Sequence, residues 1–405
     1  MCPYLRNVLK CPTLTLVNHF VASLKFLKTA RPVALQQNGE DALLERFKVS
    51  AEDQVRVPED SLRETVGAIF EKMGVPPEDA ALGADVLTST DLRGVETHGV
   101  SNMLRTYVGQ YNQGTLNPRP NWRVTRESPG TAVIDADKGL AVILGPKAMN
   151  MAIEKARTVG VGIVTMFNAG HSGGIGHHAM LAAQQDMVGL VTTAASVQVV
   201  PTFGAEPRLG TNPIAMAAPA KNEPPFLFDA ATSAVAGNKL GLARRVNANM
   251  EPGWITQTDG TPIMEEWPVP ETRGTYFHLP LGGTREMGSH KGYGLAMMTE
   301  ILGTFLSGVV PTVLDMDGGS KHSFTAYNIA AFTDVDDFKE KMDRMLQMLR
   351  ETPPAPGHDR VLYPGLSEYE EEQDRRANGI PLHKEVVEWF SDICGELSIP
   401  TLRTM

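Results

Sequence analysis

Apolar residues recur every three or four positions in the first organised part of the sequence, which predicts two amphipathic helices. The first helix begins after Pro58 with acidic residues in its first turn, and Gly74 ends it as a C-terminal cap. The second begins at residues 76–79 and runs to about Gly94. The apolar positions of the two helices are Leu62, Val66, Ile69, Phe70, Met73, Leu82, Val86 and Leu87.

The pattern changes from about residue 131, where short β-like runs alternate with helical segments. Such alternation predicts an α/β layer domain. The β-like runs cover residues 132–134, 161–166, 190–193 and 226–228, with helices expected around residues 148–156 and 180–182. Beyond them, residues 292–307 are expected to form a buried amphipathic helix, 328–332 a short strand, and 338–349 and 386–394 helices.

The composition narrows the class of protein. The chain has 405 residues, with 37 Lys and Arg against 47 Asp and Glu, and its net charge of −10 argues against a nucleic-acid binder. No run of about eighteen apolar residues occurs, so no membrane-spanning helix is expected. The three cysteines, Cys2, Cys11 and Cys394, form no C-x-x-C pair, which favours a reducing compartment and a cytoplasmic protein.

The start of the chain differs from the rest. The first 39 residues carry basic side chains and no carboxylate. This composition is typical of organelle transit peptides, and a transit peptide would direct the protein into an organelle. The same pattern is expected if the start of the sequence is assigned too far upstream, so that these residues are not translated. Residues 1–56 are therefore predicted to be a disordered N-terminal extension, with organised sequence beginning near Val57.

The richest candidate segment is residues 168–178, which lie between a predicted strand and a helix and contain Gly170-His171-Ser172-Gly173-Gly174. The segment matches the nucleophile elbow G-x-S-x-G, so Ser172 could serve a hydrolase. His171, with His177 and His178 nearby, could bind a metal, although no acid or cysteine is close and no metal is predicted. His171 could also act alone as a general acid and base. For a hydrolase, the base would be His290, His322 or His358.

Further segments have a functional and a structural interpretation each. His98 precedes Gly99 at the end of a helix, and Arg105, which follows it, could pair with a carboxylate or lie at the surface. Residues 229–233 and Lys291 stand at helix starts, where free backbone donors suit an anion and where simple capping is equally expected. Neither a Rossmann glycine fingerprint with its downstream acid nor a P-loop is present.

Six ordered motifs together resemble the type-2 malate/L-lactate dehydrogenase family, which is distinct from the Rossmann lactate and malate dehydrogenases and includes ureidoglycolate, sulfolactate and diketogulonate oxidoreductases. The resemblance runs from about residue 57 to the C-terminus. The motifs are Asp91-Leu92-Arg93-Gly94, Thr97-His98-Gly99-Val100, Gly170-His171-Ser172-Gly173, Leu209-Gly210-Thr211-Asn212-Pro213, Asp229-Ala230-Ala231-Thr232-Ser233 and Lys291-Gly292-Tyr293-Gly294, and Tyr363-Pro364-Gly365 also fits.

The resemblance implies a non-Rossmann α/β fold, in which a mixed β-sheet NAD(P)-binding domain is flanked by helical regions from both chain ends. The implied divisions are a helical substrate and dimer region at 57–130, the NAD(P)-binding domain at 131–290 and a C-terminal helical region at 291–405 that completes the fold. It implies a homodimer that uses NAD, with NADP left open, to move a hydride between nicotinamide and a 2-hydroxy or 2-oxo acid. The other interpretations are a serine hydrolase and a cofactor-binding protein without turnover.

The resemblance also implies roles for individual residues. His171 becomes the proton donor and acceptor and His98 a substrate-pocket histidine, while the implied cofactor contacts are Ala195, Asp229, Ala230, Ala231 and Lys291. The chain departs from the family at Asn102, where many relatives carry an arginine that meets the substrate carboxylate. Asparagine cannot form a charge-assisted bidentate pair, so either Arg105 takes over or the substrate differs from plain malate or lactate.

Overall fold

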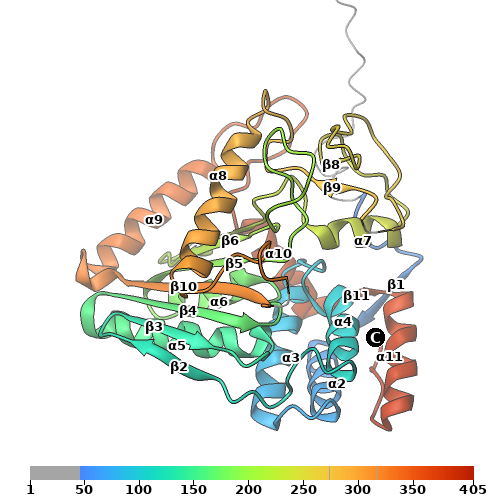
Figure 1. Ribbon diagram of the computed structural model, residues 1–405, viewed down its shortest axis with the longest axis horizontal. Coiled ribbons are helices and arrows are strands. Elements are labelled where there is room, and N and C mark those ends of the chain that lie inside the picture. The colour runs from blue at the N-terminus through green and yellow to red at the C-terminus, as the bar shows by residue number, and fades with distance from the viewer. Residues whose placement is uncertain (1–45, 273, 317) are drawn as a thin grey trace, which may run out of the picture.

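The protein is built around a seven-stranded mixed sheet in a computed structural model that describes residues 46–272, 274–316 and 318–405 (Figure 1). The strand order is β2-β3-β4-β10-β5-β6-β7; β3 and β4 are parallel and every other neighbouring pair is antiparallel. The strands are β2 (Arg123–Glu127), β3 (Thr131–Asp135), β4 (Val161–Ala169), β5 (Met187–Ala194), β6 (Ile214–Ala218), β7 (Phe226–Ala230) and β10 (Ser320–Asn328). The predicted mixed α/β fold is confirmed.

Helices cover both faces of this sheet. α5 (Ala141–Val159) and α6 (Ile175–Ala183) pack on one face through small side chains such as Ala148, Ala152 and Ala179. α8 (Ser289–Thr299) and the π-helical turn η2 (Glu300–Phe305) cross the other face (Figure 1). The prediction of one buried helix over residues 292–307 is wrong in two respects. The helix changes to π-helical geometry at Glu300, and one side of it is exposed.

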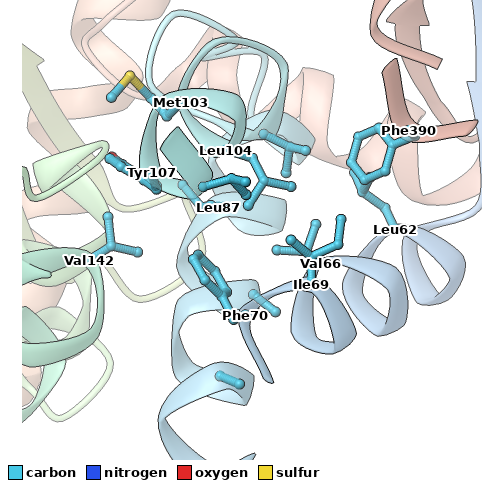
Figure 2. Close-up of a cluster of buried hydrophobic side chains, with 14 of the residues drawn as sticks. Leu62, Val66, Ile69, Phe70, Leu87, Met103, Leu104, Tyr107, Val142 and Phe390 are labelled. Carbon is cyan, nitrogen blue, oxygen red and sulfur yellow. The ribbon is translucent and has the colours of Figure 1, made fainter. Parts of the chain in front are cut away.

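A second core joins the two ends of the chain (Figures 1 and 2). The helices α2 (Glu59–Lys72), α3 (Pro77–Leu92) and α4 (Val100–Asn112) pack with α11 (Lys384–Leu397), and β1 (Gln54–Val57) pairs antiparallel with β11 (Ile380–His383). In Figure 2 the predicted core positions Leu62 and Val66 lie near Phe390 of α11. Helical regions from both chain ends therefore flank the sheet, as the resemblance implied.

Smaller elements complete the described chain. They are α7 (Gly237–Arg245), β8 (Ile255–Thr256), β9 (Phe277–His278), the 3-10 turn η3 (Ile329–Ala331), α9 (Val335–Arg350) and α10 (Leu366–Asn378). Residues 329–332, predicted to be strand, form η3 and the bend after it, because the Asn328 side chain accepts a hydrogen bond from Ala330 N–H and closes a tight turn. No described helix has both the length and the apolar character needed to cross a membrane.

Organised structure begins before Val57. Phe47 is buried and stacks on Trp254 with ring centroids 5.7 Å apart, and β1 starts at Gln54. Residues 46–56 are therefore part of the fold, because they bury an aromatic ring and supply one strand of a two-stranded sheet. The remainder of the predicted extension, residues 1–45, lies outside the described residues.

Candidate functional site

A cavity of about 780 Å³ opens between α4 and the carboxyl ends of β4 and β5. This is the edge at which the strand–helix alternation predicted a site, because the loops after β4 and β5, which flank β10, both leave the sheet there. Its volume lies in the range of small-molecule sites. The lining includes His98, Met103, Thr106, Tyr107, Gln110, Leu116, Lys138, Asn168, Gly170, His171, Ala195, Ser196, Gln198, Thr211, Asn238 and Ser320.

His171 lies in the loop between β4 and α6 and is held by two contacts to its Nδ1 atom. The Tyr107 hydroxyl is 2.7 Å from Nδ1, and the Gly173 N–H donates to the same atom at 3.1 Å. Gly173 has a φ of +66°, a region that favours glycine, and this turn brings its N–H back to the ring. Because Nδ1 accepts the Gly173 N–H, the proton of the neutral ring sits on Nε2.

Burial, together with smaller contributions from the nearby His98 and His322, lowers the pKa of His171 to about 3. His171 is therefore neutral at physiological pH in the free protein. The ring can take up a proton at Nε2 only in its other neutral tautomer, which carries the proton on Nδ1. In that tautomer the Nδ1–H group can donate a hydrogen bond to the Tyr107 oxygen. The Tyr107 hydroxyl, which can donate or accept, makes both protonation states of this histidine possible.

His98 lies beside His171, with the two rings stacked at 5.7 Å between centroids and 13° between planes. Its Nδ1 is 2.8 Å from the Thr97 hydroxyl, and burial lowers its pKa to about 4. Two rings that could each carry a proton are thus kept neutral next to each other, because a charge on either one would be poorly solvated. A ligand that brings a carboxylate into the cavity would raise both pKa values.

The position of His98 is set by the buried carboxyl of Asp91. Val100 N–H, at the start of α4, donates to Asp91 Oδ2 at 2.5 Å. A Cβ on Gly99 would fall 2.4 Å from Asp91 Oδ1, so only glycine fits between them. Arg375 of α10 donates to the Asp91 carbonyl oxygen at 2.7 Å, which ties this turn to the C-terminal region. Burial raises the pKa of Asp91 to about 8.

The turn at residues 209–213 forms another wall of the cavity. Asn212 is fully buried; its Oδ1 accepts from Ala195 N–H at 2.9 Å, and its Nδ2 donates to Ala296 O and to Glu300 Oε1 at 3.1 Å each. One side chain therefore joins the end of β5 to α8 and η2. The neighbouring Thr211 lines the cavity.

Three residues of the predicted site, His98, His171 and Ala195, line this cavity, and the others do not. Arg105 is exposed, pairs with Glu385 at 3.3 Å and lies over the Trp389 ring. Arg105 faces α11 because it lies on a different side of α4 from Met103 and Tyr107, which line the cavity. Asn102, on the same helix, is half-buried and also lies outside the cavity lining.

The predicted cofactor residues beyond Ala195 stand elsewhere. Asp229 Oδ2 accepts the Gly176 N–H at 2.6 Å and so holds the start of α6, which is a capping role. Ala230 and Ala231 follow it, half-buried, and Lys291 is exposed at the start of α8. None of these four residues lines the cavity around His171.

The hydrolase interpretation of Ser172 is not supported. The serine is buried, and its hydroxyl is 3.4 Å from the Thr193 hydroxyl, which in turn is 2.9 Å from His322 Nδ1. His322 thus reaches Ser172 only through Thr193, whereas a nucleophilic serine needs its base in direct contact. The Ser172 carbonyl meets His178 Nε2 at 3.0 Å, so this residue is held within the fold.

The sequence analysis did not identify Tyr107, Gln110, Lys138 or Asn238 as site residues. Tyr107 stands 64 positions from His171 in the chain, and no local pattern indicates that they meet. The helical periodicity of α4 was the one available signal, since it places Met103, Tyr107 and Gln110 on a common face.

Comparisons with known proteins identify the family of the chain. The family described as malate/L-lactate dehydrogenase matches residues 57–391. The chain is 38% identical to a malate dehydrogenase of Pyrococcus abyssi over 357 residues, 87% of this chain and 97% of that protein. It is 36% identical to an L-sulfolactate dehydrogenase of Methanocaldococcus jannaschii, with 82% and 94% covered.

Solved structures give the same result. The malate dehydrogenase of Entamoeba histolytica is 32% identical with a TM-score of 0.81, covering 86% of this chain and 99% of that one. The malate dehydrogenase of Pyrococcus horikoshii is 36% identical with a TM-score of 0.79, covering 88% and 99%.

Proposed function

The chain belongs to the malate/L-lactate dehydrogenase family and is a nicotinamide-dependent 2-hydroxyacid dehydrogenase, and from this premise we propose that His171 is its proton donor and acceptor. One observation carries this assignment. His171 lines the cavity while both contacts to its ring are made at Nδ1, so Nε2 is the nitrogen available to a substrate oxygen. Histidine in such a position can exchange a proton with a hydroxyl or carbonyl group.

The cavity suits the nicotinamide end of the cofactor. Ser196, Gln198, Thr211 and Asn238 offer hydroxyl and amide groups to a carboxamide and a ribose, and no aspartate or glutamate among the described lining residues would repel a phosphate. We propose that Ala195 packs against the dinucleotide here. Residues 229–231 and Lys291 stand outside this cavity, and we keep them as proposed contacts for the remaining length of the cofactor.

When bound in this cavity, the nicotinamide would supply or accept the hydride at the C2 carbon of the substrate. Oxidation of a 2-hydroxy acid requires the His171 tautomer that carries its proton on Nδ1, where this N–H donates a hydrogen bond to the Tyr107 oxygen; Nε2 then takes the hydroxyl proton. In reduction, the protonated ring returns the proton to the carbonyl oxygen. His98, stacked on His171 and fixed by Thr97, orients the substrate and excludes water from one side of the ring.

We propose NAD rather than NADP as the cofactor. The two differ only at the adenosine ribose, which lies at the opposite end of the dinucleotide from the nicotinamide. Rates measured with NADH and NADPH at equal concentrations test this, and a preference for NADPH would contradict it.

The assignment of His171 is tested with His171→Gln and a matched control, His177→Gln, which stands on α6 near Asp85 and outside the cavity. We expect His171→Gln to bind NADH normally and to lose about 10²–10⁴-fold in kcat, the usual contribution of a general acid or base. The control should retain its rate. A His171→Gln protein with wild-type turnover would refute the assignment.

We further propose a homodimer. An apolar row on the outer side of α8 and η2 is exposed, and contiguous exposed apolar surface commonly marks a protein interface. The row consists of Met297, Met298, Ile301, Phe305 and Leu306. Light scattering of the purified protein tests this, since a monomer would contradict it.

A cytoplasmic location is also proposed, because Cys394 is a buried free thiol, which suits a reducing compartment. Cell fractionation tests it.

A further inference from the structure

The cavity around His171 contains a single charged side chain of the lysine, arginine, aspartate or glutamate type among the described residues that line it, and this is Lys138. Lys138 lies in the connection between β3 and α5 and is exposed. The next lysine, Lys321, stands behind the wall: it is buried, and its Nζ is 3.1 Å from the hydroxyl of Thr312. Lys138 is therefore the one cation of this type that the described lining offers to a ligand.

The backbone holds Lys138 next to the His171 loop. Lys138 N–H donates to Asn168 O at 2.9 Å, and Gly170 N–H donates to Gly139 O at 2.9 Å, so two segments far apart in sequence run side by side up to the residue before His171. Lys138 has a φ of +59°, in the left-handed region that side-chain-bearing residues rarely adopt. Such conformations cluster at functional sites, because the surrounding structure must enforce them.

The acidic neighbours of Lys138 already have other partners. Asp137 Oδ2 accepts from Asn121 N–H at 2.8 Å, and Asp135 pairs with Arg123 at 3.0 Å. No ion pair or side-chain hydrogen bond joins Lys138 to any other described residue. Its ammonium group is thus available, and lysine carries its charge on a flexible stem that can adjust to a bound anion.

A 2-oxo acid carries a carboxylate that needs a positive partner, and the cavity has few. His98 and His171 are neutral in the free protein because burial lowers their pKa values to about 4 and about 3. The two positions from which an arginine could have served are unsuitable: Asn102 is uncharged, and Arg105 is directed to Glu385. A charge-assisted hydrogen bond is about twice as strong as a neutral one, so the position of the cation matters.

We propose that Lys138 binds a carboxylate of the 2-oxo or 2-hydroxy acid and is the specificity-determining cation of the substrate pocket. This inference rests on the proposed function of the same site. The substrate carboxylate pairs with the Lys138 ammonium on one side of the reacting carbon, and His171 meets the oxygen to be protonated.

The test compares Lys138→Met and Lys138→Arg with a control, Lys72→Met, which removes an exposed charge at the end of α2, outside the cavity. Reduction of oxaloacetate and of pyruvate is followed with NADH, and NADH affinity is measured by fluorescence. We expect Lys138→Met to lose about 10- to 100-fold in kcat/KM, the range for a hydrogen bond to a charged group. Lys138→Arg should recover most of the loss, with NADH affinity unchanged in all variants.

The pattern of loss identifies the carboxylate. An equal loss on both acids assigns Lys138 to the carboxylate beside the reacting carbon, and a loss on oxaloacetate alone assigns it to the second carboxylate. The proposal would be overturned if Lys138→Met kept the wild-type kcat/KM, or if this variant bound NADH more weakly and lost kcat/KM for that reason.

Failure of the proposed function gives a different result, because the wild-type protein would then reduce neither acid. Calorimetry of oxalate binding to the protein–NADH complex then measures the contact between Lys138 and a carboxylate without turnover. Equal oxalate affinity in wild type and Lys138→Met would overturn the role of Lys138.

Discussion

Replacing Tyr107 by phenylalanine tests the mechanism most directly. Tyr107 is completely buried on α4, and its hydroxyl lies 2.7 Å from His171 Nδ1. Burial raises the pKa of Tyr107 well above its ordinary value, so the hydroxyl stays protonated. Phenylalanine keeps the ring packed in the core shown in Figure 2 and removes only the oxygen. Gly173 N–H still satisfies Nδ1 of the neutral ring.

The size of the effect follows from the two charge states of His171. A hydrogen bond between neutral groups contributes about 0.5–1.5 kcal/mol, and one to a charged group about 1.5–3 kcal/mol. The transition state of either direction places charge on the imidazole, so Tyr107→Phe removes more stabilisation there than in the free protein. The difference of about 1.4 kcal/mol corresponds to about tenfold in kcat/KM and to one unit in the pKa of His171.

The assay is kcat/KM for reduction as a function of pH, with NADH affinity measured separately. Loss of the acceptor oxygen disfavours protonated His171, so the falling limb of the reduction profile should move to lower pH by about one unit. Tyr111→Phe is the matched control, because Tyr111 is on the same helix and packs edge-on against Phe70. A Tyr107→Phe protein with an unchanged rate and profile would show that the hydroxyl plays no part in proton transfer.

Two further predictions concern stability and substrate binding. Burial lowers the pKa of His178 to about 3 and of His322 to about 4, so below about pH 6.5 the unfolded chain binds more protons and stability falls as pH decreases. Asp91, with its pKa raised to about 8, has the opposite sign and offsets slightly more than one histidine, which leaves a loss of about 1 kcal/mol between pH 6.5 and 5 for these three groups. The lowered pKa values of His98 and His171 add to this loss in the whole protein. Denaturant unfolding at the two pH values measures it, and equal stability would contradict the burial argument. Arg105→Met should leave KM for 2-oxo acids within about twofold and cost less than about 1 kcal/mol, because its partner Glu385 is half-exposed. A tenfold rise in KM would contradict this expectation and indicate that Arg105 binds the substrate.

The sequence predicted the layout of the fold better than the details of the site. Alternating apolar runs located β3, β4, β5 and β7, because side-chain periodicity is a local property of the chain. It could not give the sheet order, in which β10 inserts between β4 and β5 although more than 120 residues separate Thr193 from His322. The helix at residues 292–307 was predicted to be amphipathic and buried, whereas in the structure a row of its apolar side chains faces outward.

For the site, the local motifs singled out His171 and His98, which both line the cavity, since each histidine stands beside glycines that permit a tight turn. The partners of those residues were decided by tertiary structure alone. Tyr107 and Lys138 reach the cavity because α4 and the connection after β3 pack against the loop after β4, and Arg105 is excluded because its side of α4 faces α11. Chemistry carried by one short segment can be predicted from residue types, whereas chemistry shared between segments depends on which surfaces pack together.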